Sequence, residues 1–324
     1  MPWFVDHFRH LTDLGEYSCP IYLLSFFLFA LAFLIIKQRY TLKAALATML
    51  AKDVWLSRSA GVDYAFLMIN EFLFRVPNAV LFVFLTNALS LLTVAVLGIK
   101  VPLIGSAVAG GSVSWLLTLW VLVLLDLGSY LTHRLQHQVP FFWRFHAVHH
   151  SATSLNPLTV FRQHPVDMLL YTLLRAALLG IGTGIFSCVF ALDQGVLQVA
   201  GVNAGLVIFY LTASLRHSHV PLAFPAAIRY VLFSPHLHQI HHSSAPRHQR
   251  VNFGVIFAVW DRCLGTYLDE QVLGGVLFGL SRDDSAVRHS VARLYLEPMG
   301  IEFRDGYSTP SLPEHSAREV DATT

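Results

Sequence analysis

Five long apolar stretches constrain the fold of this 324-residue chain more than any other feature. A helix that crosses about 30 Å of hydrocarbon needs about 20 mostly apolar residues. Charged residues make up only 13% of the chain, whereas soluble domains carry about 25%. The stretches are, in approximate bounds, residues 21–36, 78–99, 113–131, 168–192 and 196–215. We therefore expect an integral membrane protein with about four or five transmembrane helices.

The first stretch is the shortest and has the length of a signal-peptide core. Asp6, Asp13 and Glu16 precede it, where a signal peptide carries positive charge. We interpret it as a retained anchor. The following segment, from Thr41 to Arg75, mixes apolar and basic residues, which is typical of a chain that lies along a membrane surface.

The basic residues between the stretches predict how the helices are oriented. They gather after the first stretch and between the third and fourth, at Lys37, Arg39, Lys43, Lys52, Arg58, Arg134, Arg144 and Arg162. The loop 100–112 has a single lysine and no arginine. By the positive-inside rule, residues 37–77, 132–167 and those after 215 are cytoplasmic and the N-terminus lies opposite. Within the stretches, the pairs Gly180/Gly184 and Gly201/Gly205 predict close packing between helices.

Histidine is the anomalous residue type, with seventeen copies, of which eight form three main clusters. The clusters are His133/His137, then His146/His149/His150, then His238/His241/His242. Residues at i, i+3 and i+4 of a helix share one face, so each HxxHH run can aim its imidazoles at a common point. All three clusters fall on the predicted cytoplasmic side. Eight imidazoles exceed the needs of one metal, and two metals with four or five imidazoles each fit the count.

Other chemistries are less compatible with these clusters. A zinc hydrolase of the HExxH type places a glutamate between its ligands, and no carboxylate stands between these histidines. A metal transporter needs ionisable groups deep inside several spans, where the chain offers little beyond Asp126 and Arg175. The three cysteines are far apart and form no CxxC pair. The basic residues are dispersed and the net charge is +2, which excludes a nucleic-acid partner.

The sequence around the clusters resembles the fatty acid hydroxylase/sterol desaturase superfamily, the eight-histidine membrane di-iron oxygenases. The similarity covers roughly residues 70–270 and extends beyond the histidines themselves. It is carried by residues 126–134 (DLGSYLTHR), 143–151 (WRFHAVHHS), 216–219 (RHSH), 234–242 (SPHLHQIHH) and 252–267, with its Asn-Phe-Gly and Trp-Asp-Arg-Cys-Leu-Gly-Thr-Tyr segments.

The resemblance implies an all-α fold, with a transmembrane stalk under a cytoplasmic helical cap that holds a di-metal centre. It implies these metal ligands: His133, His137, His146, His149, His150, His238, His241 and His242, with His217 as a ninth. His164 and His219 are further candidates as ligands or as donors to ligands. Asp126 and Asp261 are candidate acceptors that orient a ligand imidazole, although each also suits a purely structural role.

On the same basis we divide the chain into four parts. Residues 1–70 form an N-terminal anchor and interfacial segment, 71–270 the catalytic domain, 271–304 a C-terminal extension of the cap, and 305–324 a disordered tail.

The implied activity is O2-dependent hydroxylation of a lipid C–H bond in an acyl chain or a sterol-like ring, with lipid desaturation as the alternative. The implied cofactor is a pair of iron ions, for which zinc can substitute, and O2 is the co-substrate. The chain shows no flavin, haem or iron–sulfur motif. Electrons must therefore come from a separate donor, such as a reductase, a ferredoxin or a cytochrome b5. We expect a multi-pass protein of a bacterial inner membrane or the endoplasmic reticulum, with its active site on the cytoplasmic side.

Overall fold

The structure is a computed structural model that describes residues 20–99, 110–190, 198–199, 202–269, 276–280, 289–301 and 303. The regular secondary structure of the described residues is helical except for one short antiparallel ladder, β1 (Gln198–Val199) with β2 (Val202–Asn203), and isolated bridges. The first half contains α2 (Pro20–Ala32), the π-helix η2 (Phe33–Lys37), α3 (Leu42–Met49), α4 (Lys52–Trp55), α5 (Arg58–Leu73), α6 (Arg75–Leu97), α7 (Gly110–Gln138) and α8 (Pro140–His150). The second half contains η3 (Pro157–Phe161), α9 (Pro165–Val189), α10 (Ala204–Arg216), α11 (Ala226–Arg229), α12 (Pro235–His241), η4 (Pro246–His248), α13 (Val259–Cys263), α14 (Val291–Leu296) and η7 (Glu297–Met299).

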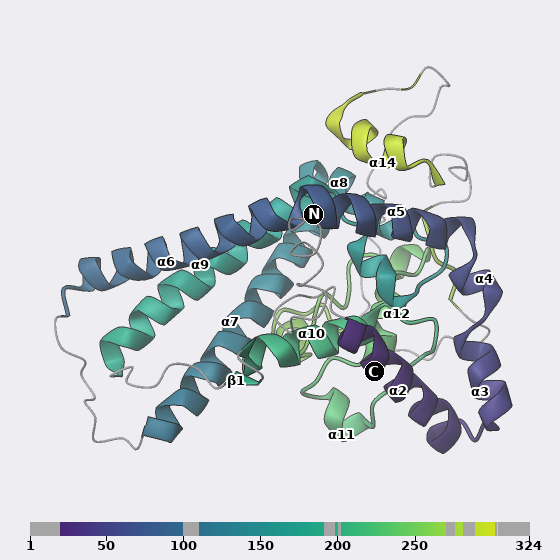
Figure 1. Cartoon of the computed structure of the whole chain (residues 1–324), viewed down its shortest axis with the longest axis horizontal. Helices are drawn as coiled ribbons and strands as arrows, with labels where there is room; N and C mark the ends of the chain where they lie inside the picture. The colour runs from purple at the N-terminus through teal and green to yellow at the C-terminus, as the bar shows by residue number, and fades with distance from the viewer. Residues whose placement is uncertain are drawn as a thin grey trace, which may run out of the picture.

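Three helices among the described residues are long and apolar enough to cross a membrane: α6, residues Val113–Gln138 of α7, and α9. They form an elongated arm that projects from one side of the molecule (Figure 1). Among the described residues the structure thus has three candidate spans, where the sequence predicted four or five. The fifth apolar stretch forms the short ladder and then α10, whose 13 residues reach only about 20 Å. The first stretch is also a shorter apolar helix, Ile21–Lys37.

Helices α6 and α9 lie side by side along the arm (Figure 1). A Cβ atom added to Gly180 would lie 2.6 Å from the Thr86 carbonyl oxygen, and one added to Gly184 would lie 2.8 Å from that of Ser90. The predicted close packing through these two glycines is therefore confirmed. Gly201 lies outside the described residues.

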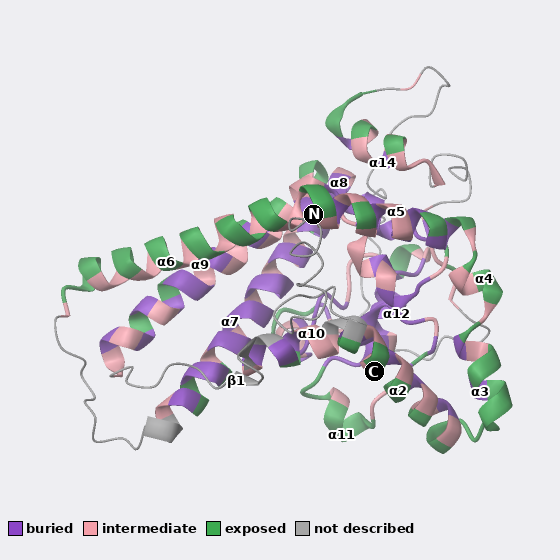
Figure 2. Ribbon diagram, in the orientation of Figure 1, coloured by how far each residue is buried: buried purple, intermediate pink, exposed green. Residues whose placement is uncertain are grey.

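The two faces of the arm differ in burial. No residue of α6 is buried, and large apolar side chains such as Val80, Phe84 and Leu91 are exposed along it. Helix α7 is mostly buried, because α9, α10 and the segment around Val255 pack on it (Figure 2). Exposed apolar side chains are expected where a helix faces lipid rather than water. The arm therefore has the surface of a membrane-embedded unit.

Helix α5 is part of the domain that surrounds the histidines. Its buried residues include Asp63, Phe66 and Asn70, and the Asn70 amide donates to the carbonyl oxygens of Phe161 and Gln163 at 2.9 Å each. The predicted boundary at residue 70 thus falls inside this helix. By contrast, α3 exposes Leu42, Leu46 and Leu50, as a surface-lying segment would.

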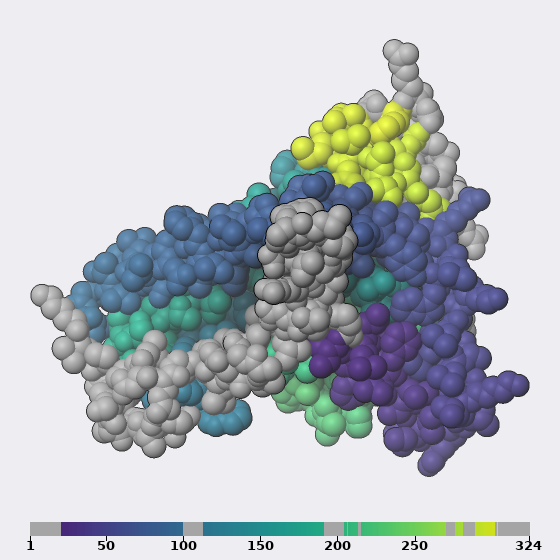
Figure 3. Space-filling model, in the orientation of Figure 1, coloured from purple at the N-terminus to yellow at the C-terminus, as the bar shows by residue number. Residues whose placement is uncertain are grey.

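The C-terminal residues cover α5. Leu294 of α14 is in the same apolar cluster as Val62 and Phe66, and the Tyr295 ring stacks on Phe66 with centroids 4.4 Å apart. In the space-filling view the C-terminal segment that includes α14, in yellow, lies against the blue segment that includes α5 (Figure 3). The predicted disordered tail, residues 305–324, lies outside the described residues.

Candidate metal centre

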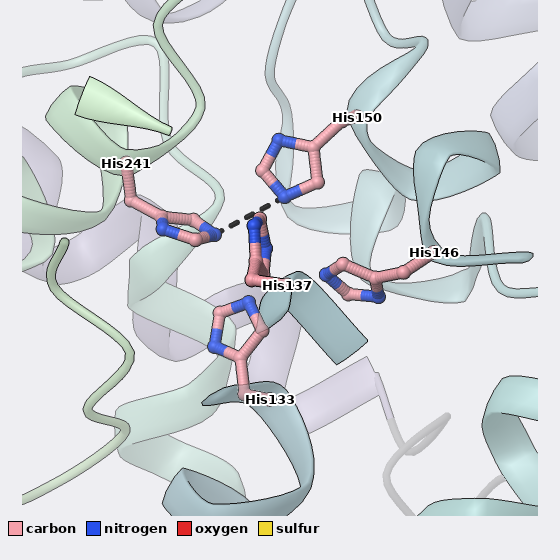
Figure 4. A group of neighbouring side chains, drawn as sticks. All are labelled: His133, His137, His146, His150 and His241. Carbon is pink, nitrogen blue, oxygen red and sulfur yellow. Dashed lines mark hydrogen bonds between the residues drawn. The ribbon is translucent and has the colours of Figure 1, made fainter. Parts of the chain in front are cut away.

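Nine buried histidines gather in two groups at the end of α7 that lies away from the tip of the arm. The five-histidine group contains His133, His137, His146, His150 and His241; the four-histidine group contains His149, His217, His238 and His242. Within each group the candidate ligand atoms all lie within 4.8 Å of one another. Figure 4 shows the five-histidine group, with imidazoles from three segments pointing toward a shared centre. The structure therefore brings together all eight cluster histidines and His217.

Helix geometry distributes each HxxHH motif between the two groups. His146 and His150, at i and i+4, belong to the five-histidine group, whereas His149 belongs to the other. On α12 and its C-cap, His238 and His242 share the four-histidine group, whereas His241 belongs to the five-histidine group. The i and i+4 side chains lie one above the other, and i+3 projects to the side of them. We expected each motif to aim its imidazoles at one common point. In the structure each motif instead contributes histidines to both groups.

The distances between nitrogens fit two metal sites. In the four-histidine group, Nε2 of His217 lies 2.9 Å from Nε2 of His149 and 3.0 Å from that of His238. In the five-histidine group, the Nε2 atoms of His150 and His241 are 3.1 Å apart. Imidazole nitrogens bind zinc-like metals at about 2.0–2.1 Å, so two ligands at a right angle around one ion are about 3.0 Å apart.

Backbone carbonyls set the tautomer of three of the imidazoles. The Nδ1 atom of His133 lies 3.1 Å from the Phe253 oxygen, that of His241 2.7 Å from the Val251 oxygen, and that of His149 3.2 Å from the Arg162 oxygen. Because only an Nδ1–H can donate to a carbonyl, the Nε2 lone pair of each ring is left free for a metal.

Several ligand atoms lack any partner within the described chain. The Nε2 atoms of His133, His137 and His146 are buried and make no hydrogen bond there. Buried polar atoms of a native protein are nearly always satisfied by protein, water or an ion. A metal at the centre of the five-histidine group would satisfy all three at once, so the residues present fit such an ion.

Burial keeps those imidazoles that lie outside the arm neutral, which is the form that binds metal. It lowers the pKa of His149, His150, His217, His238 and His242 well below the usual value, and neighbouring imidazoles lower it further. Burial also lowers the pKa of His241 to about 3, although the Val251 carbonyl opposes the shift. These rings therefore carry no proton on their ligand nitrogen at neutral pH.

Sequence reasoning missed Asp167, a carboxylate that contacts one of the grouped histidines. Its Oδ2 atom is 3.2 Å from Nδ1 of His146, and both side chains are buried. Asp167 stands in the first turn of α9, where the helix dipole favours an acid. The available signal was the acid that follows the candidate ligand His164 by three residues, just before the fourth apolar stretch.

The two carboxylates that were candidates for orienting an imidazole, Asp126 and Asp261, accept hydrogen bonds mainly from backbone amides instead. Asp126 accepts from the amides of Ile256 (2.8 Å) and Phe257 (3.1 Å) and from Nε1 of Trp260 (2.8 Å). Asp261 accepts from the amides of Phe253 (2.9 Å) and Gly254 (2.8 Å) and from the Thr266 hydroxyl (2.7 Å).

Burial raises the pKa of Asp261 to about 6, against these hydrogen bonds. Both acids fasten the loop that includes Val251 and Phe253, whose carbonyls meet His241 and His133. Their influence on the imidazoles therefore passes through the position of this loop rather than through a direct hydrogen bond.

The two further candidate ligands lie outside both groups. His164 caps α9: its Nδ1 accepts from the Val166 amide at 3.1 Å, and its Nε2 lies 3.0 Å from the Tyr295 oxygen. His219 lies beside α3, with Nε2 3.1 Å from the Thr48 oxygen and its ring near Phe26 and Trp55. The structure gives both histidines contacts that join segments of the chain.

The region that holds these histidines is similar to known proteins. The fatty acid hydroxylase family model matches residues 118–266, which include all nine histidines. The ornithine lipid hydroxylase OlsE of Rhizobium tropici is 30% identical over 45% of the chain and 40% of its own length. The alkylglycerol monooxygenases of Caenorhabditis elegans and Xenopus tropicalis are each 27% identical over 51% of the chain and over 30% and 33% of their own lengths. No solved structure matches.

The chain matches these relatives over only 30–40% of their own lengths. The region that matches the family model lies inside the predicted catalytic domain and includes most of α7, all of α8 and α9, and the segment that leads to Thr266. Residues 118–266 thus match a fatty acid hydroxylase domain, and the relatives that the chain resembles are named as lipid hydroxylases and monooxygenases.

Proposed function

We propose that this protein is a membrane-bound oxygenase that hydroxylates a lipid C–H bond at a di-iron centre. The observation that carries the proposal is the pair of buried histidine groups, one of five residues and one of four, within the region that matches the family model. The names of the relatives support the reaction class, because they are lipid hydroxylases and monooxygenases. His133, His137, His146, His150 and His241 would hold one ion, and His149, His217, His238 and His242 the other.

Iron is the metal that the proposed reaction favours. Imidazole suits iron, zinc and copper alike, so the choice depends on the reaction. A hydrolytic zinc site needs a nearby acid as general base, and among the described residues the one carboxylate hydrogen-bonded to either group, Asp167, is bound to His146. Two bound irons would supply the redox chemistry that activates O2 toward a C–H bond.

The residues of the chain itself would orient the ligands and exclude water. Each of the nine histidines is at most 5% exposed, and an enclosed site protects reactive species from bulk solvent. Helix α7 runs from the apolar arm directly into the five-histidine group, since it carries both Val121 and His133. A lipid could therefore approach the metals without leaving an apolar environment. The basic loops favour a cytoplasmic position for the centre, and the electrons would come from a separate redox protein.

The test is turnover of the purified full-length protein with a reductase, ¹⁸O2 and candidate lipids of the alkylglycerol and ornithine-lipid classes. We expect about two irons per chain and ¹⁸O in a new hydroxyl group. The His238→Ala variant serves as the control for metal-dependent turnover. An unlabelled alkene would assign the protein to desaturation, and turnover without O2 would exclude an oxygenase.

A further inference from the structure

A charged side chain lies in the membrane arm below the metal centre. Arg175 belongs to α9, one of the three candidate spans, and is half-buried. A charge inside a span is costly and is normally retained for a function or a partner. The histidine groups do not use it, so its contacts need a separate explanation.

The neighbouring helices fix the direction of this side chain. Its Nε donates to the Ser129 hydroxyl on α7 at 2.8 Å. Its guanidinium lies 4.4 Å from the ring centre of Tyr171 and 5.1 Å from that of Phe209. A Cβ atom at Gly128 would come within 3.2 Å of the Arg175 Cα and Cγ atoms, so the absence of a side chain there admits the arginine. Arg175 thus crosses toward α7 and does not extend along α9 toward headgroups.

The guanidinium of Arg175 has no carboxylate partner of its own among the described residues. No carboxylate there lies within salt-bridge distance of it, and its two terminal nitrogens make no hydrogen bond within the described chain. Asp126 acts on it electrostatically, but both oxygens of that acid already accept N–H groups from residues 256–260. The charge of Arg216, a second cation, also acts on Arg175. The terminal nitrogens of Arg175 therefore keep hydrogen-bonding capacity for an anionic group.

The position of Arg175 relative to the centre is set by α7. Ser129, which anchors it, precedes His133 by one helical turn, or about 6 Å along the axis. Arg216, the second cation, directly precedes His217. An anionic group held at Arg175 would therefore lie close below the metal centre on the side of the arm.

We propose that Arg175 binds the acidic group of the lipid substrate and so selects lipids that carry a carboxylate or a phosphate. This inference rests on the proposed function, because the lipid is a substrate only if the protein oxidises it. The binding of the acidic group can nevertheless be tested without turnover. The guanidinium fork suits a planar or tetrahedral anion, and its fixed position reduces the entropy lost on binding. The bound acid would place carbons only a few bonds away beside the metals.

The test compares tritiated palmitate with tritiated methyl palmitate, which lacks the charge, by scintillation proximity on the detergent-solubilised full-length protein. We expect wild-type protein to bind palmitate more tightly than the ester. Arg175→Gln should weaken palmitate binding by about 10- to 100-fold, as the loss of a charged hydrogen bond predicts, and leave ester binding unchanged. Arg175→Lys should retain part of the preference. Hexadecyl phosphate, run in parallel, assigns the site to carboxylate or phosphate.

The matched control is Arg262→Gln. Arg262 also stacks on two rings, those of Tyr230 and Tyr267, and donates through Nε to an oxygen, but it lies on α13 outside the arm. Equal binding of palmitate and its ester by wild-type protein would overturn the proposal even if the Gln variant fails to fold. Equal losses for both ligands in Arg175→Gln would assign the arginine to structure alone. A failure of lipid oxidation would leave these binding results intact, so the two proposals fail separately.

Discussion

The two histidine groups use one residue type but differ in how firmly the imidazoles are held. In the five-histidine group, Nδ1 of His133, His146 and His241 each has a protein partner. In the four-histidine group the buried Nδ1 atoms of His217 and His238 have no hydrogen-bond partner among the described residues.

The helices that carry the histidines also favour a firmer hold on the five-histidine group. Four of the five histidines in the first group stand on α7 and α8, whereas His217 lies just after the 13-residue α10. Hydrogen bonds from the second ring nitrogen fix orientation and raise ligand basicity. We infer that the five-histidine group is the more preorganised site and holds its metal more tightly.

The largest effect is expected from removing one ligand of each group. His137→Ala and His217→Ala should each lower the metal content from about two ions to one. Each should also reduce turnover by more than about 100-fold, because removing only the hydrogen-bond partner of a ligand already costs about 10- to 100-fold. Elemental analysis after timed dialysis against a chelator measures the difference. The ion that remains in His217→Ala should be lost more slowly than the one in His137→Ala, and equal rates would remove the distinction between the groups.

The next effect concerns the buried pair between Asp63 on α5 and Arg162. Arg162 Nε donates to Asp63 at 2.7 Å, both side chains are fully buried, and the Arg162 carbonyl accepts from His149 of the four-histidine group. Burial raises the pKa of Asp63, whereas the charge of Arg162 lowers it.

Breaking a buried pair from one side costs about 3–5 kcal/mol. Asp63→Ala should therefore lower the free energy of unfolding by that amount and release metal first from the four-histidine group. Thermal unfolding and metal analysis check this, with the exposed Asp53→Ala as control. Loss of metal from the five-histidine group first would contradict the assignment of Arg162 to His149.

A smaller effect is expected from Asp167→Asn, which removes the charge beside His146 and keeps the shape. The affinity of the five-histidine group for its metal should fall by about 10- to 100-fold, while the other group is unchanged. Asp269→Asn is the matched control, because Asp269 lies 3.5 Å from Nε2 of His236, a histidine outside both groups. If both variants weaken metal binding alike, the effect is not specific to the contact with His146.

The structure brings together the histidines that the sequence singled out, because ligand spacing on a helix is a local property. Three clusters with i, i+3 and i+4 spacing were enough to find eight residues, and the resemblance supplied His217. The division of each cluster between two groups was not predictable, because it depends on how α7, α8 and α12 are placed around one another. The partner of His146 was missed for the same reason, since Asp167 is 21 residues away.

The spans were predicted less well because apolar composition does not distinguish a crossing helix from a packed one. The stretch 196–215 has the hydrophobicity of a span, yet residues 204–216 form a short helix that packs between α2 and α7. Likewise, the mixed composition of residues 58–73 resembles a surface segment, whereas Asp63 and Asn70 face inward to bind polar groups. Such partners lie about 90 residues away and leave no local signal.

The smallest effect separates a helix cap from a ligand. His164 is the N-cap of α9 and accepts from the Val166 amide through Nδ1. His164→Ala should cost about 1 kcal/mol of stability, as other lost N-caps do, and leave two metals in place. Asparagine is among the best N-cap residues, so His164→Asn should restore most of that stability although it removes the imidazole. A variant that keeps its unfolding midpoint but loses an ion would show that His164 binds metal. The asparagine variant is decisive because a cap needs only a suitable oxygen or nitrogen acceptor, whereas a ligand of this centre must be an imidazole.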